Sequence, residues 1–227
     1  AYNLLGTANT NWQDEILRTS VSSDYNLSVG GTYKILPYRV AVSYTNQNGI
    51  LKTSAMDRVT ASITLNPKFF DNTLSVTANV KGFYMHNRFA DEGAIGGAVS
   101  FDPSQSVRVD NLPIGNGYFT WLKPGTDEFI GIAPVNPVSL IDERSMKADV
   151  YRSVGNLQLD YVMPFLPALH ANLNLGYDVS HSIQHNLMTP DSPLTYKENK
   201  KTGLGQDERL RQLKRNLLLD FYLNYKQ

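Results

Sequence analysis

Leu-His-Ala-Asn-Leu-Asn-Leu-Gly-Tyr-Asp-Val occupies residues 169–179 of the chain. Apolar and polar side chains alternate here with a period of two, and this period places them on opposite faces of a β-strand. Residues 73–86 and 214–226 repeat the pattern, with apolar residues on one side and mainly serine, threonine, asparagine or aspartate on the other. We therefore predict an all-β fold.

The same alternation marks seven segments of the chain. We expect strands at about 20–32, 37–46, 56–66, 73–86, 150–162, 168–181 and 214–226, joined as an antiparallel meander. One face is apolar in every strand. A soluble sheet with one wet face and a transmembrane β-barrel with a polar lumen both produce this pattern, so the alternation alone leaves both interpretations open.

The lengths of the connections favour the barrel. On these boundaries they are about 4, 9, 6, 63, 5 and 32 residues, which is a strict alternation of short and long. Transmembrane barrels carry short turns on one side of the membrane and long loops on the other. The long connections, which we expect to face outward, lie at about 47–55, 87–149 and 182–213. The largest exceeds what a compact domain usually contains unless the loop has a function.

The composition excludes several classes of protein. Lys plus Arg and Asp plus Glu each total 21, and this zero net charge argues against a nucleic-acid partner that is bound by neutralising phosphates. The chain has no cysteine, which excludes disulfide scaffolds, cysteine-ligated metal centres and thiol nucleophiles. No apolar run approaches the roughly 20 residues that a membrane-spanning helix needs.

The strands carry the residue types expected in a β-barrel that separates lipid from a water-filled lumen. Tyrosines gather near many strand ends, as in the interfacial girdles of barrels, although tyrosine is also common in soluble strands. They are Tyr25, Tyr38, Tyr44, Tyr84, Tyr151, Tyr161, Tyr177, Tyr222 and Tyr225. Charged residues on the polar side of the strands would line the lumen. They are Arg39, Arg58, Lys81, Asp160, Asp178 and Asp220.

Three aromatic residues stand out in the longest connection. Tyr118, Phe119 and Trp121 have flat rings of the kind that stack on the apolar faces of sugars. We take them as the candidate substrate-binding residues. Packing within the loop itself is the alternative role for these rings.

Other chemistry-bearing residues give no catalytic pattern. His181 and His185 are four apart, a spacing that bridges a metal on a helix, but we expect them where a strand enters a loop. The acidic pairs 14–15, 91–92 and 142–143 are adjacent in sequence and do not by that fact face a glycosidic bond from two sides. We expect Asp14 and Glu15 in the first turn of a short helix capped near Thr10. No enzyme activity, cofactor or metal is therefore predicted.

Several motifs together resemble one family. Residues 10–19 read TNWQDEILRT, residues 25–31 YNLSVGG, residues 37–54 PYRVAVSYTNQNGILKTS and residues 91–103 DEGAIGGAVSFDP. Their order, with RVTASITLNPKFFDNTLSVTANVKG between the last two, resembles the SusC/RagA group of TonB-dependent outer-membrane transporters of Bacteroidetes. Each motif alone is short, whereas the combined order is specific and covers nearly the whole chain.

This resemblance implies a large barrel of about 22 strands in the bacterial outer membrane. Seven strands cannot close such a barrel, so residues 1–227 are expected to be a part of its wall. The plug domain and the TonB-contacting segment lie upstream in the family and are not in this chain. The implied partners are the remaining barrel and plug segments, the TonB complex, a SusD-like surface lipoprotein, outer-membrane lipid and a glycan or peptide substrate.

Two functions remain open from the sequence. The first is part of an energised importer of oligosaccharides, or alternatively of peptides, whose outward loops gate the entry of substrate. The second is a soluble extracellular β-sandwich that binds glycans without transporting them. The two differ in how the apolar faces are covered, because a sandwich packs them together into a closed core.

Overall fold

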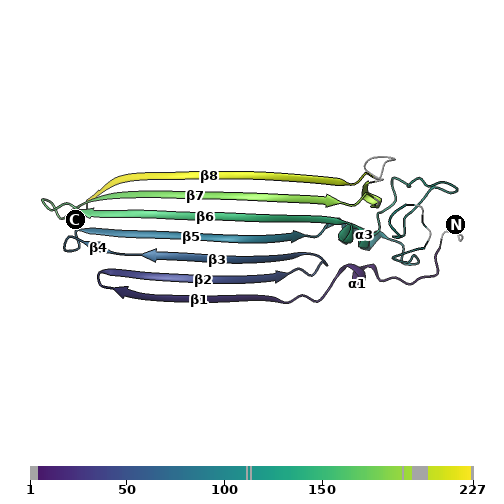
Figure 1. Cartoon of the computed structure of the whole chain (residues 1–227), viewed down its shortest axis with the longest axis horizontal. Coiled ribbons are helices and arrows are strands. Elements are labelled where there is room, and N and C mark those ends of the chain that lie inside the picture. The colour runs from purple at the N-terminus through teal and green to yellow at the C-terminus, as the bar shows by residue number, and fades with distance from the viewer. Residues whose placement is uncertain (1–4, 111, 113, 191, 196–203, 226–227) are drawn as a thin grey trace.

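The computed structural model describes residues 5–110, 112, 114–190, 192–195 and 204–225. One antiparallel sheet dominates it, with the strand order β1-β2-β3-β5-β6-β7-β8 and with β4 paired to β5 (Figure 1). The strands are β1 (Ser22–Tyr33), β2 (Leu36–Asn48), β3 (Ala55–Leu65), β4 (Lys68–Phe69), β5 (Leu74–Phe89), β6 (Arg144–Val162), β7 (Leu169–Met188) and β8 (Gln206–Tyr225). The predicted all-β antiparallel meander is confirmed.

Three short helices lie at one end of the sheet. They are α1 (Trp12–Ile16), α2 (Gly93–Ser100) and α3 (Pro137–Asp142). Figure 1 shows α1 and α3 beyond the ends of the strands, on the side where the long connections are gathered. Within the described residues, no helix is long and apolar enough to cross a bilayer.

The opposite end of the sheet carries tight turns. Residues 34 and 35 join β1 to β2, and Lys34 adopts a left-handed φ of 54°. Between β4 and β5, residues 70–72 have φ values of 53°, 52° and 70°, and the Thr73 backbone N–H closes this turn on the Phe70 carbonyl at 3.0 Å. The two ends of the sheet therefore differ as predicted, with turns at one end and long connections at the other.

The outer ends of the last three strands correct the sequence prediction. β6 begins at Arg144 rather than 150, β7 ends at Met188 rather than 181, and β8 begins at Gln206 rather than 214. The long connections consequently shrink to 49–54, 90–143 and 189–205. These strand ends mix polar and apolar residues on both faces, so they carry no regular alternation from which a strand could be recognised. β4 was also missed, because two residues are too few for a period.

The apolar core of the chain lies among the helices rather than against the sheet. Its buried members are Trp12, Ile16, Leu51, Ala90, Ala94, Ala98, Phe101, Leu140 and Ile141. The strands have no second layer of described structure over either face (Figure 1). The sheet is therefore a single layer, and a small packed cluster of loops and helices lies at one of its ends.

Candidate functional site

One face of the sheet carries a continuous apolar band that is exposed. Residues paired directly across an antiparallel sheet share a face, and the register runs without a bulge through every pair of long strands. Val42 on this face is 48% exposed and Leu217 is 85% exposed. Other exposed members are Leu27, Val29, Val40, Val59, Ile63, Val80, Leu157, Leu175, Leu219, Phe221 and Leu223. Soluble monomers rarely expose an apolar surface of this extent.

An aromatic row closes this band towards the helices. Its rings belong to Tyr25, Tyr44, Tyr84, Tyr151 and His181, which lie in one row of register partners from β1 to β7 that β3 crosses at Val59. The Tyr84 and Tyr151 ring centroids are 4.9 Å apart. The Tyr44 hydroxyl donates to Asp57 at 2.9 Å and the Tyr84 hydroxyl donates to Asp149 at 2.7 Å. Both carboxylates lie one row further out, so the aromatic row marks the change from apolar to polar surface.

The other face is polar. It carries all six charged residues that were predicted to line a lumen: Arg39, Arg58, Lys81, Asp160, Asp178 and Asp220. Arg152 binds Asp178 in bidentate fashion at 2.8 and 2.6 Å, and His170 Nδ1 lies 2.8 Å from Asp160. Tyr222 also lies here, opposite Asn172, so its predicted place in a girdle is wrong. Its even position on β8 puts it on the other side from Phe221.

The long connection between β5 and β6 folds onto the N-terminal segment. The Trp12 indole N–H donates to the Asp102 carbonyl at 3.0 Å, and the Trp12 ring packs edge-on against Phe101 with centroids 4.6 Å apart. The Ala8 and Ser104 backbones are joined by a 3.0 Å hydrogen bond. We call the packed unit of residues 90–143 and 8–17 the loop cluster. Its buried core makes it an ordered cap over one end of the sheet.

The three predicted substrate-binding residues lie in this loop cluster but in different surroundings. Tyr118 is 2% exposed, and its hydroxyl receives a hydrogen bond from Arg108 at 2.5 Å and donates to Asp142 at 2.7 Å. Phe119 and Trp121 are half-buried and pack edge-to-face at 5.0 Å, against the side of the core that contains Phe101. That these rings contact a substrate stays a prediction.

Glu143 is the most perturbed acid of the loop cluster. It is 5% exposed, and within the part of the chain that the structure describes neither of its carboxylate oxygens lies within hydrogen-bonding distance of a partner. Burial raises the pKa of this carboxyl to about 7, and this rise outweighs the opposing influence of Asn116, Ser192 and Arg108. The backbone carbonyl of Glu143 meanwhile accepts the Thr189 N–H at 3.3 Å. Glu143 thus couples the loop cluster to the connection that follows β7.

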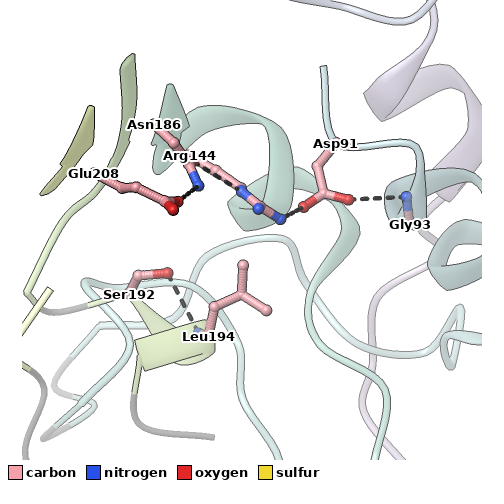
Figure 2. Close-up of polar contacts among 7 residues, drawn as sticks. All are labelled: Asp91, Gly93, Arg144, Asn186, Ser192, Leu194 and Glu208. Carbon is pink, nitrogen blue, oxygen red and sulfur yellow. Dashed lines mark hydrogen bonds and ion pairs between the residues drawn. The ribbon is translucent and has the colours of Figure 1, made fainter. Parts of the chain in front are cut away.

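A series of hydrogen bonds crosses the rim of the polar face next to the loop cluster (Figure 2). Arg144 donates to Asp91 at 2.8 Å, and Asp91 also accepts the Gly93 N–H at 2.9 Å. Arg144 reaches Asn186 at 3.4 Å, and Asn186 lies 3.5 Å from Glu208. This hydrogen-bond series joins the start of the long connection to β6, β7 and β8, and so fixes the loop cluster on the sheet.

The histidine pair departs from its predicted place, whereas the predicted short N-terminal helix is present, with Asp14 and Glu15 in its first turn. His181 and His185 lie within β7 on its apolar side, not at the entry to a loop, and His185 Nε2 is 2.6 Å from Asp207. The N-cap of α1 is Asn11, whose amide donates to Asp14, whereas the Thr10 hydroxyl donates to the Gln105 carbonyl at 2.6 Å. Among the described residues, no group of three or more His, Cys, Asp or Glu side chains is placed to hold a metal ion.

Asn136 is a structural residue that the sequence reasoning missed. It is 1% exposed, its side-chain oxygen caps α3 at the Val138 N–H, and its amide donates to the Val107 carbonyl at 2.9 Å. Proline at the next position is the available signal, because Asn at the N-cap with Pro at N1 is a frequent start of a helix.

The two faces and the tight and long ends together define the class of the protein. The sheet is a single antiparallel layer with one exposed apolar face, an aromatic row at the border of that face and a polar opposite face. These features are typical of the wall of a transmembrane β-barrel. No protein-family model matches the chain. The chain is 37% identical to the TonB-dependent receptor SusC of Bacteroides thetaiotaomicron, over 97% of the chain and 22% of that receptor.

Solved structures agree with this match at the level of the fold. The chain superposes on the RagAB peptide importer in its closed-closed state with a TM-score of 0.69 and 17% identity, over 96% of the chain and 23% of the matched chain. In the open-open state the TM-score is 0.67, over 93% and 22%. The resemblance is therefore confirmed: the chain corresponds to a stretch of barrel wall of the SusC/RagA family of TonB-dependent outer-membrane transporters. It spans about a fifth of the length of these relatives.

Proposed function

We propose that this chain is part of the barrel wall and outward loops of a TonB-dependent importer in the bacterial outer membrane. The observation that carries the proposal is the exposed apolar band, which is continuous across seven strands and bordered by the aromatic row. Such a face is stable against hydrocarbon and unstable in water. The polar face then lines the lumen.

The soluble glycan-binding sandwich is disfavoured by the same observation. A sandwich needs a second sheet packed about 10 Å from the first, with the two apolar faces interdigitated. In the described chain the apolar band has no such partner, and the buried core lies beyond the strand ends. Lipid on one side and water on the other account for both faces without an additional layer.

The relatives give the proposed cargo and partners. We infer that the complete protein imports oligosaccharides or peptides, because the resemblance to the SusC/RagA group implies a glycan or peptide substrate and one solved structure that the chain resembles is a peptide importer. A SusD-like lipoprotein would bind over the outward loops, and TonB would supply the energy through a plug. The residues of this chain would form a conduit and carry out no chemistry on the cargo.

The loop cluster is proposed to act at the mouth of the barrel. Tyr118 is held between Arg108 and Asp142 and fixes the backbone beside it. Phe119 follows Tyr118 directly, Trp121 comes two residues later, and both residues are only half-buried. We propose that these two rings meet the substrate while Tyr118 positions them, because rigid aromatic surfaces bind sugars and apolar side chains with little loss of entropy.

Uptake by cells tests this function. Cells that carry the intact receptor should take up one class of labelled oligosaccharide or peptide, and uptake should stop both when the receptor gene is deleted and when the TonB energiser is removed. Val42→Asp, on the apolar band, should also lower the amount of receptor in the outer membrane, whereas Ala41→Asp on the polar face should not. Unchanged uptake of every tested substrate after deletion would overturn the proposal.

A further inference from the structure

A patch of basic residues lies on the membrane-facing side of the sheet, outward of the aromatic row. Arg88, Lys147, His185 and Arg209 are direct register partners across β5, β6, β7 and β8. Arg211 continues the patch along β8 on the same face. We call these five residues the basic patch. It spans four adjacent strands, or about 14 Å at the usual spacing between strands.

The register places the basic patch at the depth of lipid headgroups. Arg88 and Lys147 are four residues outward of Tyr84 and Tyr151, which is about 13 Å along a strand. Strands of outer-membrane barrels tilt by roughly 40°, which leaves about 10 Å along the membrane normal. Aromatic girdles lie at the border of the hydrocarbon, so side chains beyond them meet the polar headgroups. This step rests on the proposed function, since it takes the apolar band as the lipid-facing surface.

The charges of the basic patch are only partly compensated within the chain. Asp207 pairs with His185 at 2.6 Å and lies 3.9 Å from Arg209. In the described ranges, no carboxylate forms an ion pair with Arg88, Lys147 or Arg211. Asp149 is the nearest carboxylate by register, one row inward, and it already bonds with Tyr84 and His86.

Arg88 shows the missing partner most directly. Its Nε atom is buried and has no hydrogen-bond acceptor among the described residues. Arg88 and Lys147 also face each other directly, and like charges in directly opposed positions destabilise a sheet. On the polar face, by contrast, Arg152 and Arg144 each have a carboxylate, at 2.6 and 2.8 Å. An anion from outside the chain would satisfy the basic patch.

We propose that the basic patch binds the phosphate groups of a phosphorylated glycolipid headgroup in the outer leaflet. Arginine guanidinium groups bind phosphate oxygens in bidentate fashion, and lysine adds a compact positive charge. The long stems of these side chains lie along the apolar surface while their charged ends reach the headgroup layer. The aromatic row would contact the same lipid at the base of its headgroup. The patch thus anchors the wall in the outer leaflet at the foot of the loop cluster.

The test uses the complete receptor in nanodiscs of defined lipid. The probe is a diphosphorylated diglucosamine glycolipid, and its comparison is the same lipid without phosphate. Wild-type receptor should retain the phosphorylated lipid about tenfold or more in preference to the dephosphorylated one, as measured by native mass spectrometry. The preference should weaken as the salt concentration rises. Equal retention of both lipids by the wild type would overturn the proposal without any variant.

Variants assign the effect to the basic patch. A triple variant should reduce the preference for the phosphorylated lipid to within about threefold. It combines Arg88→Gln, Lys147→Gln and Arg211→Gln. Arg39→Gln/Arg58→Gln/Lys81→Gln removes the same charge from the polar face and should leave the preference unchanged. Loss of the preference in both triple variants, or in neither, would contradict the proposal. Complete displacement of the phosphorylated lipid by inorganic phosphate at equal concentration would contradict it as well. Uptake measured in parallel separates the two proposals, because a receptor that transports but shows no phosphate preference refutes only this one.

Discussion

Tyr177 lies across Gly155, its direct partner on β6, and leaves no room for a side chain there. A Cβ added to Gly155 would come within 2.2 Å of Tyr177 Cε1. The Tyr177 hydroxyl meanwhile is 3.0 Å from Ser153 Oγ, so the ring is held in place from the next position on β6. Both residues face the apolar side, where an unsatisfied hydroxyl would be costly. The glycine therefore makes room for a tyrosine whose polar atom is paired.

Gly155→Ala should destabilise the wall. The ring must leave its place and give up the bond with Ser153, which we expect to cost about 1–3 kcal/mol. The measurement is the thermal midpoint of the full receptor in detergent. Gly82→Ala is the matched control on the same face, because the nearest atom to its added Cβ is 3.8 Å away, and it should shift the midpoint little. Equal midpoints for the two variants would contradict this packing.

Glu143→Gln should stabilise the loop cluster above neutral pH and leave it unchanged in acid. The pKa of Glu143 is raised from 4.5 to about 7, so the folded cluster holds this proton more tightly than the opened one. Below pH 4.5 the Glu143 carboxyl is protonated in both the folded and the opened cluster, so its burial does not lower the stability of the cluster. Between 4.5 and 7 the opened form ionises first and stability is lost, and above pH 7 the loss is complete, about 3 kcal/mol.

Proteolysis of the loop cluster in the full receptor measures this effect. The rate of cleavage of the variant relative to wild type should be near one at pH 4.5 and fall by about tenfold or more at pH 8. Glu128→Gln changes an exposed acid that pairs with Lys123 in the same connection, and it should not show this pH dependence. A ratio that is constant with pH for Glu143→Gln would be inconsistent with a buried, ionising carboxyl.

Asp91 and Arg144 should be energetically coupled. Their 2.8 Å ion pair is partly buried, with the side chains 14% and 28% exposed. A double-mutant cycle with Asp91→Asn and Arg144→Gln, read from the same proteolysis, should give a coupling of about 1–2 kcal/mol. The Lys123–Glu128 pair has side chains more than half exposed, and its cycle should give less than about 0.5 kcal/mol. Similar couplings for the two pairs would show that the rim pair does not fix the loop cluster.

Trp121→Ala should slow import without loss of receptor from the membrane. Removing one stacking surface is expected to lower uptake at limiting substrate by about tenfold. Phe165→Ala provides the control, because this ring is 80% exposed in the turn between β6 and β7 at the far end of the sheet. Uptake that is unaffected by Trp121→Ala would remove this ring from the substrate path.

The sequence predicted the parts of the fold in which one face is apolar and the other polar. Inside the apolar band, Leu173, Leu175 and Tyr177 alternate with polar residues, and each predicted strand is present. The alternation stops outward of the aromatic row, and the ends of β6, β7 and β8 were misplaced there. Asp207 to Arg209 read as a solvated loop because three charged residues in a row carry no period.

The loop cluster was less accessible to sequence reasoning. Its core joins Trp12 to Phe101 and Leu140, which are distant in sequence and follow no shared pattern. The raised pKa of Glu143 depends on the burial that this packing creates. The basic patch was also hidden, because Arg88, Lys147 and Arg209 become neighbours only once the register of four strands is known.

Cysteine accessibility along β2 tests the central claim most directly. The chain contains no cysteine, so single substitutions from residue 40 to 44 can be labelled in the full receptor after any cysteines elsewhere are removed. Val40→Cys, Val42→Cys and Tyr44→Cys should carry a fluorophore that lipid-soluble quenchers reach, whereas Ala41→Cys and Ser43→Cys should react with a charged, water-soluble maleimide. Strict alternation of the two behaviours is the predicted result. Water accessibility at all five positions, or burial of the odd and even positions alike, would contradict a wall with lipid on one side and water on the other.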